Sequence, residues 1–124
     1  MARILIADDD VDIRDLVAFK LTQSGHEVIA VEDGMAALKA ARSQPVDVAL
    51  LDIRMPGMSG LDVCRELRAA PETESLPVIL ITARSQEGDV ETGFAAGADD
   101  YIIKPFSPRE LSSRVQAVLT RATR

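Results

Sequence analysis

The chain of 124 residues is long enough for one domain and too short for two. Its net charge of −6 argues against direct nucleic-acid binding, because a phosphate backbone attracts basic surfaces. A single cysteine excludes an internal disulfide, and no apolar run reaches the roughly 18 residues that a membrane span needs. We therefore expect a single cytoplasmic domain over residues 1–124, with no membrane contact.

Five short apolar runs alternate with helical patterns along the chain. The runs are rich in leucine and β-branched side chains and are followed by turn residues, which is typical of buried parallel strands. They predict strands over Arg3–Ala7, Glu27–Val31, Asp47–Leu51, Pro77–Thr82 and Asp100–Ile103.

Apolar stripes with helical spacing lie between and after these strands. They predict helices over Val11–Ser24, Met35–Ser43, Ser59 to the residue before Pro71, and Glu87–Ala96. The last helix has the clearest start: Ser107 is a cap, Pro108 suits the first helical position, and Glu110 completes a capping box.

Alternating strands and helices predict an α/β fold, a doubly wound parallel sheet of five strands with helices on both faces. Of the two common strand orders, the flavodoxin-like (βα)5 order 2-1-3-4-5 better fits five strands and one acidic centre. The first and third strands are then neighbours. We therefore expect Asp8, Asp9 and Asp52 to meet at the carboxyl edge of the sheet.

The acids after the first strand exceed what helix capping requires. Asp10 alone can cap the following helix, which leaves Asp8 and Asp9 unexplained. At about 4 Å and an effective dielectric near 20, each pair of like charges costs about 4 kcal/mol. A bound cation relieves this repulsion. We expect Mg²⁺, since it accepts a few carboxylates and keeps waters that a phosphoryl oxygen can replace.

Asp52 follows the most apolar run, where a carboxylate is costly unless it is paired, metal-bound or reactive. We interpret Asp52 as a nucleophile that forms an aspartyl phosphate. Lys104 is the one cation predicted at that edge, and it would bridge Asp52 at rest and a phosphoryl oxygen after transfer. The hydroxyl of Thr82, at the end of the fourth strand, would donate to the same group.

Several further residues are expected to shape this site or its surroundings. Pro56 lies in the loop beyond Asp52, and Pro105 would aim Lys104 inward if its peptide bond were cis, which the sequence leaves open. Tyr101 is either a half-buried core residue or a side chain that moves between exposed and buried positions. Cys64 lies in an apolar helical stripe and is expected to be a buried thiol, whereas His26 is expected at the surface.

The ordered set of motifs resembles the receiver domain of two-component response regulators. The resemblance covers essentially all 124 residues, and its specificity lies in the combination and spacing of the motifs. The matching segments are Ile4-Leu5-Ile6-Ala7-Asp8-Asp9-Asp10, Asp52-Ile53-Arg54-Met55-Pro56 with Gly60, Thr82-Ala83, Gly97-Ala98-Asp99-Asp100-Tyr101 and Lys104-Pro105-Phe106.

This resemblance implies a phosphorylation-activated signalling switch. Asp52 would be the phosphoacceptor, and Asp8, Asp9, Asp52 and the backbone carbonyl of Arg54 would bind Mg²⁺. Thr82 and Lys104 would contact the phosphoryl group, and Tyr101 would turn inward when Thr82 moves. The donor would be a sensor histidine kinase or a small acyl phosphate. The protein would catalyse its own phosphotransfer and dephosphorylation and would not be an enzyme acting on other substrates.

The C-terminal part is similar to the branch of the family that carries a winged-helix DNA-binding domain (OmpR/PhoB-like). In that branch the fourth helix, fifth strand and fifth helix form a symmetric homodimer face on phosphorylation and control an output such as transcription. Here the face would use Asp100, Glu110, Arg114 and Arg121. The fourth helix departs from the pattern, because Val90 and Phe94-Ala95-Ala96 stand where more charge is expected.

Three other classes of protein fit the sequence less well. A phosphatase-type hydrolase resembles Asp-x-Asp-x-Thr at its nucleophile, but Ile53 and Arg54 follow Asp52. A flavin-binding module needs a phosphate-cradling loop after the first strand, where Asp8-Asp9-Asp10 would repel phosphate. A receiver-like domain that works without phosphorylation normally lacks a site residue, and this chain lacks none.

Overall fold

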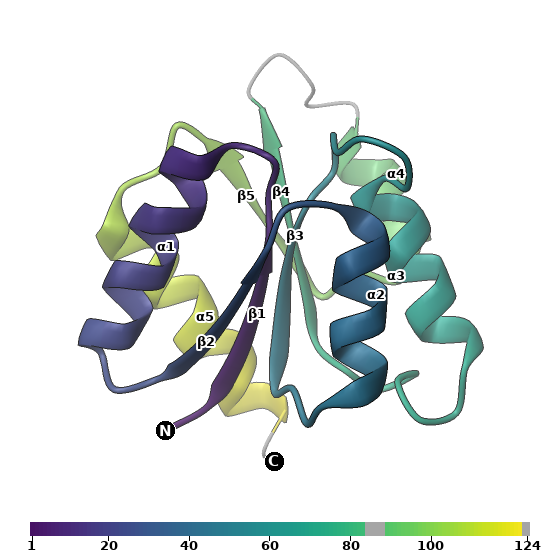
Figure 1. The fold of residues 1–124 in the computed structure, drawn as a ribbon, viewed down its shortest axis with the longest axis horizontal. Coiled ribbons are helices and arrows are strands. Elements are labelled where there is room, and N and C mark those ends of the chain that lie inside the picture. Colours follow the sequence, from purple (N-terminus) through teal and green to yellow (C-terminus); the bar gives the residue numbers. More distant parts are fainter. Residues whose placement is uncertain (84–88, 123–124) are drawn as a thin grey trace.

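In the computed structural model, which describes residues 1–83 and 89–122, five parallel strands form one sheet in the order β2-β1-β3-β4-β5 (Figure 1). The strands are β1 (Arg3–Ala7), β2 (Glu27–Val31), β3 (Val48–Asp52), β4 (Val78–Ala83) and β5 (Asp100–Lys104). The flavodoxin-like order expected from the sequence is confirmed. Because β1 and β3 are paired neighbours, the residue after β1 and the last residue of β3 lie at the same edge.

Short polar residues start most of the helices. The helices are α1 (Val11–Gln23), α2 (Gly34–Ser43), α3 (Gly60–Ala69), α4 (Asp89–Ala95) and α5 (Pro108–Ala122). Side-chain oxygens accept backbone N–H groups at the starts of four of them, from Asp10, Asp33, Ser59 and Ser107. The expected caps at Asp10 and Ser107 are confirmed. The carboxylate of Glu110, however, accepts from Arg114 Nε at 3.3 Å, where the capping box predicted a bond back to Ser107.

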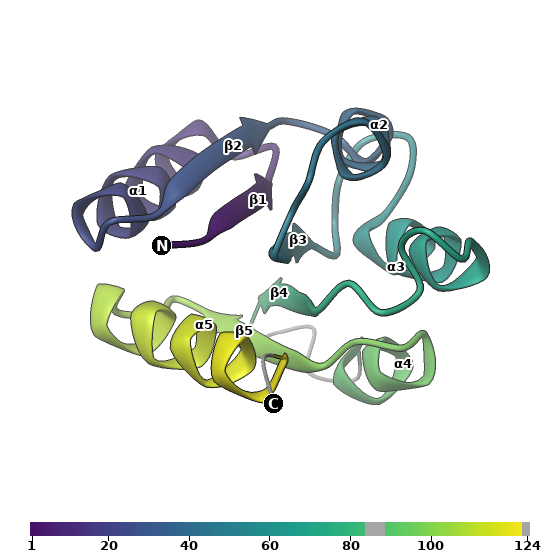
Figure 2. The ribbon, with the colours of Figure 1, turned by 90° about the horizontal axis from the view of Figure 1, so that it is seen from below.

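The helices cover both faces of the sheet, as Figure 2 shows: α1 and α5 lie on one side, and α2, α3 and α4 on the other. Successive side chains of a strand point to opposite faces. Ile4 and Ile6 therefore pack with α1 and α5, whereas Leu5 and Ala7 pack with α2 and α3. This alternation divides the interior into two cores on either side of one sheet.

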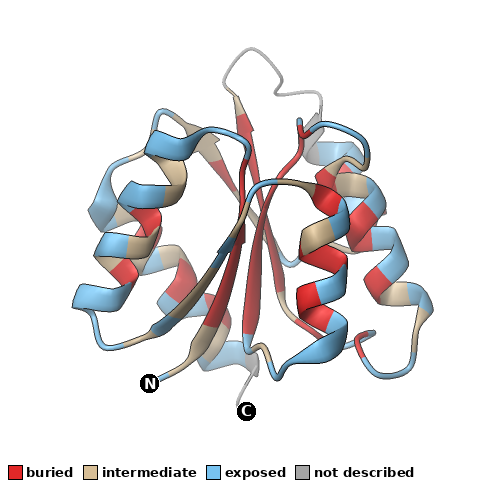
Figure 3. Cartoon of the chain, viewed as in Figure 1, coloured by how far each residue is buried: buried red, intermediate tan, exposed pale blue. Residues whose placement is uncertain are grey.

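The central strands are buried along nearly their whole length (Figure 3). Cys64 on α3 is fully buried, as expected, and its Sγ lies 3.5 Å from the main-chain oxygen of Ala96 just beyond α4. His26 is half-buried rather than freely exposed, and its Nδ1 accepts the N–H of Ala2 at 3.1 Å. The described helices include none with both the length and the apolar content needed to cross a membrane.

Element ends differ from the sequence prediction by one residue in several places. Strands β3 and β4 begin and end one residue later than predicted. At the carboxyl end of β3, the N–H of Ile53 still donates to Ile81 at 3.0 Å, which extends the ladder between the two strands. Lys104 belongs to β5, where it pairs with Ala83. Helix α2 begins one residue earlier, and α1 and α4 end one residue earlier. The predicted start of α4 at Glu87 lies outside the described residues.

Candidate functional site

The turn between β1 and α1 places three acids at the carboxyl edge of the sheet. Asp8 is fully buried; its N–H donates to Val31 at 3.2 Å, and its Oδ1 accepts the N–H of Asp10 at 2.9 Å. Asp9 is exposed. Arg14, on the first turns of α1, donates from Nη1 to the main-chain oxygen of Asp8 at 2.8 Å. The turn is thus anchored to a strand, to its own side chain and to the helix that follows.

Asp52 is the last residue of β3 and is 5% exposed. Its Oδ1 accepts the N–H of Arg54 at 3.3 Å. The main chain after Asp52 is closely packed by the start of α3, where the N–H of Gly60 donates to Ile53 at 3.1 Å. A Cβ at Gly60 would overlap the main-chain oxygen of Asp52, so the absence of a side chain there permits this approach.

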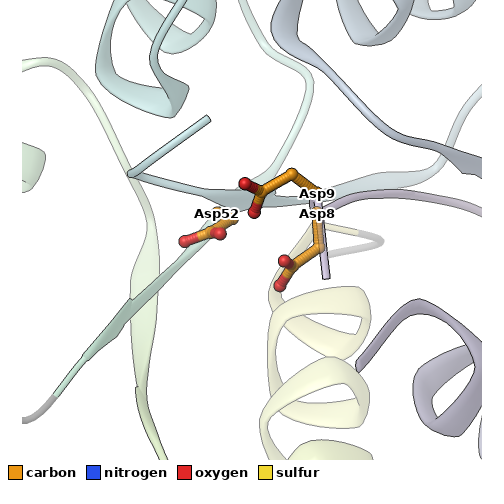
Figure 4. Close-up of side chains that lie close together, drawn as sticks. All are labelled: Asp8, Asp9 and Asp52. Atoms are coloured by element: carbon orange, nitrogen blue, oxygen red, sulfur yellow. The ribbon is translucent and has the colours of Figure 1, made fainter. Parts of the chain in front are cut away.

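The three carboxylates form one cluster at the ends of β1 and β3 (Figure 4). One oxygen from each of Asp8, Asp9 and Asp52 lies within 4.8 Å of the others. Two of these side chains are buried and one is exposed, so the cluster is open to solvent on one side. A set of hard oxygen ligands with an open side suits a divalent cation that keeps some of its waters.

Lys104 brings a positive charge into the same cluster. Its Nζ lies 3.0 Å from Asp8 Oδ2 and 3.4 Å from Asp52 Oδ2. The peptide bond between Lys104 and Pro105 is cis, which settles the alternative that the sequence left open. The structure therefore brings together the acids and the lysine that the sequence analysis assigned to one site.

The pKa of Asp52 is raised from 3.8 to about 7; burial is the largest cause, the negative charge of Asp8 adds to it, and the charge of Lys104 opposes it. For Lys104, burial alone would lower the pKa. Contacts with Asp8 and Asp52 outweigh burial, so the pKa of Lys104 is raised and the ammonium stays charged. The resting pocket therefore holds excess negative charge that one lysine does not fully balance.

Asp8 contributes a buried carboxylate oxygen to this cluster. Asp8 Oδ2 lies 3.0 Å from Lys104 Nζ, which also lies 3.4 Å from Asp52 Oδ2. A buried carboxylate is costly unless it is paired or bound to a metal. Oxygens of Asp8, Asp9 and Asp52 all lie within 4.8 Å of one another, so one ammonium is shared among three carboxylates. This set of hard oxygen ligands with excess negative charge fits Mg²⁺.

Thr82 and Tyr101 line the same small pocket between α4 and the sheet, together with Gly93 and Phe94. Thr82 is buried, and its Oγ1 donates to the main-chain oxygen of Ala83 at 3.4 Å. Tyr101 is half-buried, and its ring meets that of Phe94 edge-on at a centroid distance of 5.6 Å. The structure thus connects the threonine near the acids to the tyrosine at the outer surface through one pocket.

The remaining predicted residues lie around this centre. Arg114 on α5 pairs with Asp100 at 3.1 Å and with Glu110 at 3.3 Å, and lies 5.7 Å from the centre of the Tyr101 ring. These charges are therefore partnered within one chain. Three more residues that the sequence analysis singled out are exposed: Arg54 and Pro56 in the loop after β3, and Arg121 in the last turn of α5.

Sequence reasoning missed two long side chains that hold main-chain atoms near the site. Arg14 anchors the acidic turn. Arg68 on α3 donates to the main-chain oxygens of Gly97 at 3.0 Å and Leu76 at 2.7 Å, and pairs with Asp99 at 3.0 Å. The Arg14 contact spans six residues and those of Arg68 span from eight to 31, and the main-chain acceptors carry no residue type that a sequence pattern could mark.

Strand order and site together define a class: flavodoxin-like α/β domains with an acidic pocket and one lysine at the carboxyl edge of the sheet. The response regulator receiver domain matches residues 4–116, so the chain belongs to that family of phosphorylation-activated signalling domains. Receiver domains bind Mg²⁺ at an acidic pocket and are phosphorylated by sensor histidine kinases.

Named relatives support the assignment. The chain is 47% identical over 121 residues to the sensory transduction protein RegX3 of Mycobacterium tuberculosis, covering 98% of this chain and 52% of that protein. It is 44% identical over 119 residues to the DNA-binding response regulator MtrA of Mycobacterium leprae, covering 96% and 52%. The chain thus spans about half the length of these relatives.

A solved structure has the same fold and a metal in its site. The receiver domain of a sensor histidine kinase from Pseudomonas aeruginosa, with a magnesium ion coordinated in the active site cleft, superposes with a TM-score of 0.89. It is 33% identical in sequence, and the match covers 96% of this chain and 98% of that one.

Proposed function

We propose that Asp52 accepts a phosphoryl group from the phosphohistidine of a sensor kinase, or from a small acyl phosphate. The observation that carries this proposal is the cluster itself. Oxygens of Asp8, Asp9 and Asp52 lie within 4.8 Å of one another, and Lys104 Nζ lies 3.4 Å from Asp52. A nucleophile, an ammonium and a metal-ligand set thereby share one edge of the sheet.

In the transfer, a carboxylate oxygen of Asp52 forms the new bond to phosphorus as the bond from phosphorus to the donor's imidazole nitrogen breaks. The electron pair stays on the imidazole, which takes up a proton. Lys104 contacts Asp52 before transfer and can follow the charge to a phosphoryl oxygen afterwards. Hydrolysis of the acyl phosphate by water at the same residues would make the domain catalyse its own dephosphorylation.

Asp8, Asp9, Asp52 and the main-chain carbonyl of Arg54 are the groups that would hold Mg²⁺. When bound, the ion supplies charge neutralisation for the phosphoryl oxygens. The close approach of three carboxylates supports this assignment, because one ammonium at 3.0 Å from Asp8 and 3.4 Å from Asp52 does not balance their charge.

Phosphorylation adds about −1.5 to −2 charge at Asp52. We expect the Thr82 hydroxyl to turn toward this charge, which vacates part of the pocket that Thr82 shares with Tyr101. The ring of Tyr101 would then move inward and change the surface formed by α4, β5 and α5. The shared pocket supports this coupling of the two residues.

The altered surface would control an output domain. Because the chain spans about half of relatives that include a DNA-binding response regulator, that output is transcription in our proposal. Phosphorylation would favour a homodimer through α4, β5 and α5, with Asp100, Glu110, Arg114 and Arg121 re-paired across the interface. Light scattering with Mg²⁺ and beryllofluoride tests this; a monomer with and without beryllofluoride would contradict it.

Intact mass after incubation with acetyl phosphate and Mg²⁺ tests the central step. Wild type should gain one phosphoryl group, and the gain should vanish in Asp52→Asn and in EDTA. Asp15→Asn is the matched control, since Asp15 is an exposed acid on α1, and it should be phosphorylated like wild type. Absence of phosphorylation in folded, Mg²⁺-binding wild type, or its persistence in Asp52→Asn, would contradict the proposal.

A further inference from the structure

We propose that Arg14 is a positioning residue that holds the Asp8–Asp9 peptide in the orientation that Mg²⁺ binding requires. This inference rests on the proposed Mg²⁺-dependent function of the site. Arg14 is half-buried at the start of α1, and its Nη1 donates to the main-chain oxygen of Asp8 at 2.8 Å. Hydrogen bonds from charged donors are stronger than those between neutral groups.

The orientation of one peptide group decides where the exposed acid points. The oxygen of Asp8 and the nitrogen of Asp9 belong to one planar unit. Fixing that oxygen fixes the direction in which the chain continues to Asp9. The N–H of Asp8 donates to Val31 at 3.2 Å and the N–H of Asp10 donates to Asp8 Oδ1 at 2.9 Å, so these two bonds act on the peptide groups before Asp8 and after Asp9. Arg14 therefore supplies the bond that acts on the peptide linking the two acids.

Lys104 and Arg14 both lie near the acids, and their contacts differ. Lys104 Nζ lies 3.0 Å from Asp8 Oδ2 and 3.4 Å from Asp52 Oδ2, so it competes with a metal for carboxylate oxygens. Arg14 contacts a main-chain oxygen and leaves the carboxylate oxygens free. Loss of either positive charge would strengthen the attraction for Mg²⁺ by electrostatics alone. A weaker affinity after loss of Arg14 therefore identifies positioning, because the charge effect has the opposite sign.

The test is a Mg²⁺ titration of ¹⁵N-labelled protein, followed by amide chemical shifts, in wild type, Arg14→Met and Arg14→Lys. Partners that orient metal ligands commonly contribute 10–100-fold in affinity, so we expect the dissociation constant for Mg²⁺ to be about 10-fold higher in Arg14→Met than in wild type. Arg14→Lys should recover part of the loss, because lysine keeps a charged donor. Lys20→Met, which removes a positive charge from the last turn of the same helix, is the control and should bind like wild type.

Phosphorylation rates separate positioning from a direct role in transfer. With acetyl phosphate, Arg14→Met should need about 10-fold more Mg²⁺ for half-maximal rate but reach the wild-type rate at saturation. Equal or tighter Mg²⁺ binding in Arg14→Met, or a rate deficit that saturating Mg²⁺ does not remove, would overturn the inference. If Arg14→Met fails to fold, Arg14→Lys must show the weaker binding.

The inference and the proposed function fail in different ways. Wild type that binds Mg²⁺ in an Arg14-dependent manner but never gains a phosphoryl group would contradict the proposed function and leave the role of Arg14 standing. If wild type is phosphorylated at Asp52 while Arg14→Met binds Mg²⁺ like wild type, the role of Arg14 is contradicted and the proposed function stands.

Discussion

The two flanks of the pocket are packed by glycines in different ways. On the β3–α3 side, a Cβ at Gly60 would overlap the main-chain oxygen of Asp52. On the α4 side, a Cβ at Gly93 would lie 2.6 Å from the side-chain Cδ1 of Leu80. Main chain within a buried strand cannot yield, whereas the end of a leucine side chain can rotate. The comparison teaches that the main chain beside the acids is a rigid support, whereas the packing beneath α4 can adjust through a side chain.

Hydrogen bonds and ion pairs also differ between the two flanks of the pocket. In the acidic turn, Asp8 accepts two hydrogen bonds, from the N–H of Asp10 to its carboxylate and from Arg14 to its main-chain oxygen. Helix α4 is tied beyond its carboxyl end, where Arg68 holds the main-chain oxygen of Gly97 and pairs with Asp99. Helix α4 has seven residues, and moving elements are drawn from short units of low stability.

Gly60→Ala should produce the largest effect. The new methyl group meets the backbone of Asp52, so β3 or α3 must shift, and we expect about 3 kcal/mol lower free energy of unfolding together with impaired phosphorylation. Gly57→Ala in the same loop is the control: it has φ +74 but open space around its Cβ, so about 1 kcal/mol is expected. Urea unfolding measures both. Equal effects would remove the argument for a rigid support.

The pH dependence of stability should be the next largest effect. The pKa of Asp52 is raised from 3.8 to about 7, mainly by burial and then by the charge of Asp8, so between these values the native state binds more protons than the unfolded state. The free energy of unfolding contributed by Asp52 is therefore fully present below pH 3.8 and lost as pH rises through 7. Since one pKa unit corresponds to about 1.4 kcal/mol and neighbouring charges share the shift, we expect a loss of about 2 kcal/mol.

Asp52→Asn isolates this contribution. The difference in urea stability between Asp52→Asn and wild type, both in EDTA, should grow in favour of the variant as pH rises toward 8. Mg²⁺ should reduce this pH dependence in wild type, because metal binding favours the ionised carboxylate. A difference that does not change with pH would show that Asp52 titrates normally in the folded protein.

Arg68→Met should have an intermediate effect that is local to the α4–β5 turn. The charged donor holds the main-chain oxygens of Gly97 and Leu76, so its loss should cost about 1.5 kcal/mol. Hydrogen exchange should accelerate most at the amides of Ala98 and Asp99, which lie in this turn. Arg65→Met, which breaks an exposed pair with Asp62, is the control and should cost about 0.5 kcal/mol or less. Uniformly faster exchange would contradict a local anchor.

Gly93→Ala should have the smallest effect. Replacing a helical glycine by alanine gains about 1 kcal/mol of helix propensity, which offsets the crowding of the flexible Leu80 side chain. The net change in the free energy of unfolding should then stay within about 1 kcal/mol. Ala95→Gly, at an exposed position of the same helix, should lower the free energy of unfolding through helix propensity alone, without changing any packing. A loss for Gly93→Ala that matches Gly60→Ala would contradict an adjustable α4 side.

The sequence contains most of the fold and the positions of the site residues. Strand order followed from counting elements and locating acids, because a parallel sheet brings the ends of separate strands to one edge. The sequence pattern predicts Asp52 and Lys104 just after their strands, whereas both are the final strand residues. The error arises because the last pair of a ladder depends on partners such as Ile81 and Ala83, which lie on another strand.

Contacts from side chains to main-chain oxygens could not be predicted. The bonds of Arg14 and Arg68 end on main-chain oxygens, and every residue has such an oxygen, so no residue type marks the acceptor. The need for glycine at position 60 likewise depends on the path of β3. For Glu110, a capping box and an ion pair with Arg114 are both compatible with the sequence, and the structure has the ion pair.

Cys64 offers a natural chemical probe of the stability of the region around α4. The chain has one cysteine, and its thiol is fully buried beneath the end of α4, against the oxygen of Ala96. A disulfide reagent added to native protein can label it only during transient openings that uncover the thiol. The labelling rate, compared with that of the unfolded chain, therefore reports the free energy of that opening. Wild-type protein needs no engineered label to show whether phosphorylation loosens this helix.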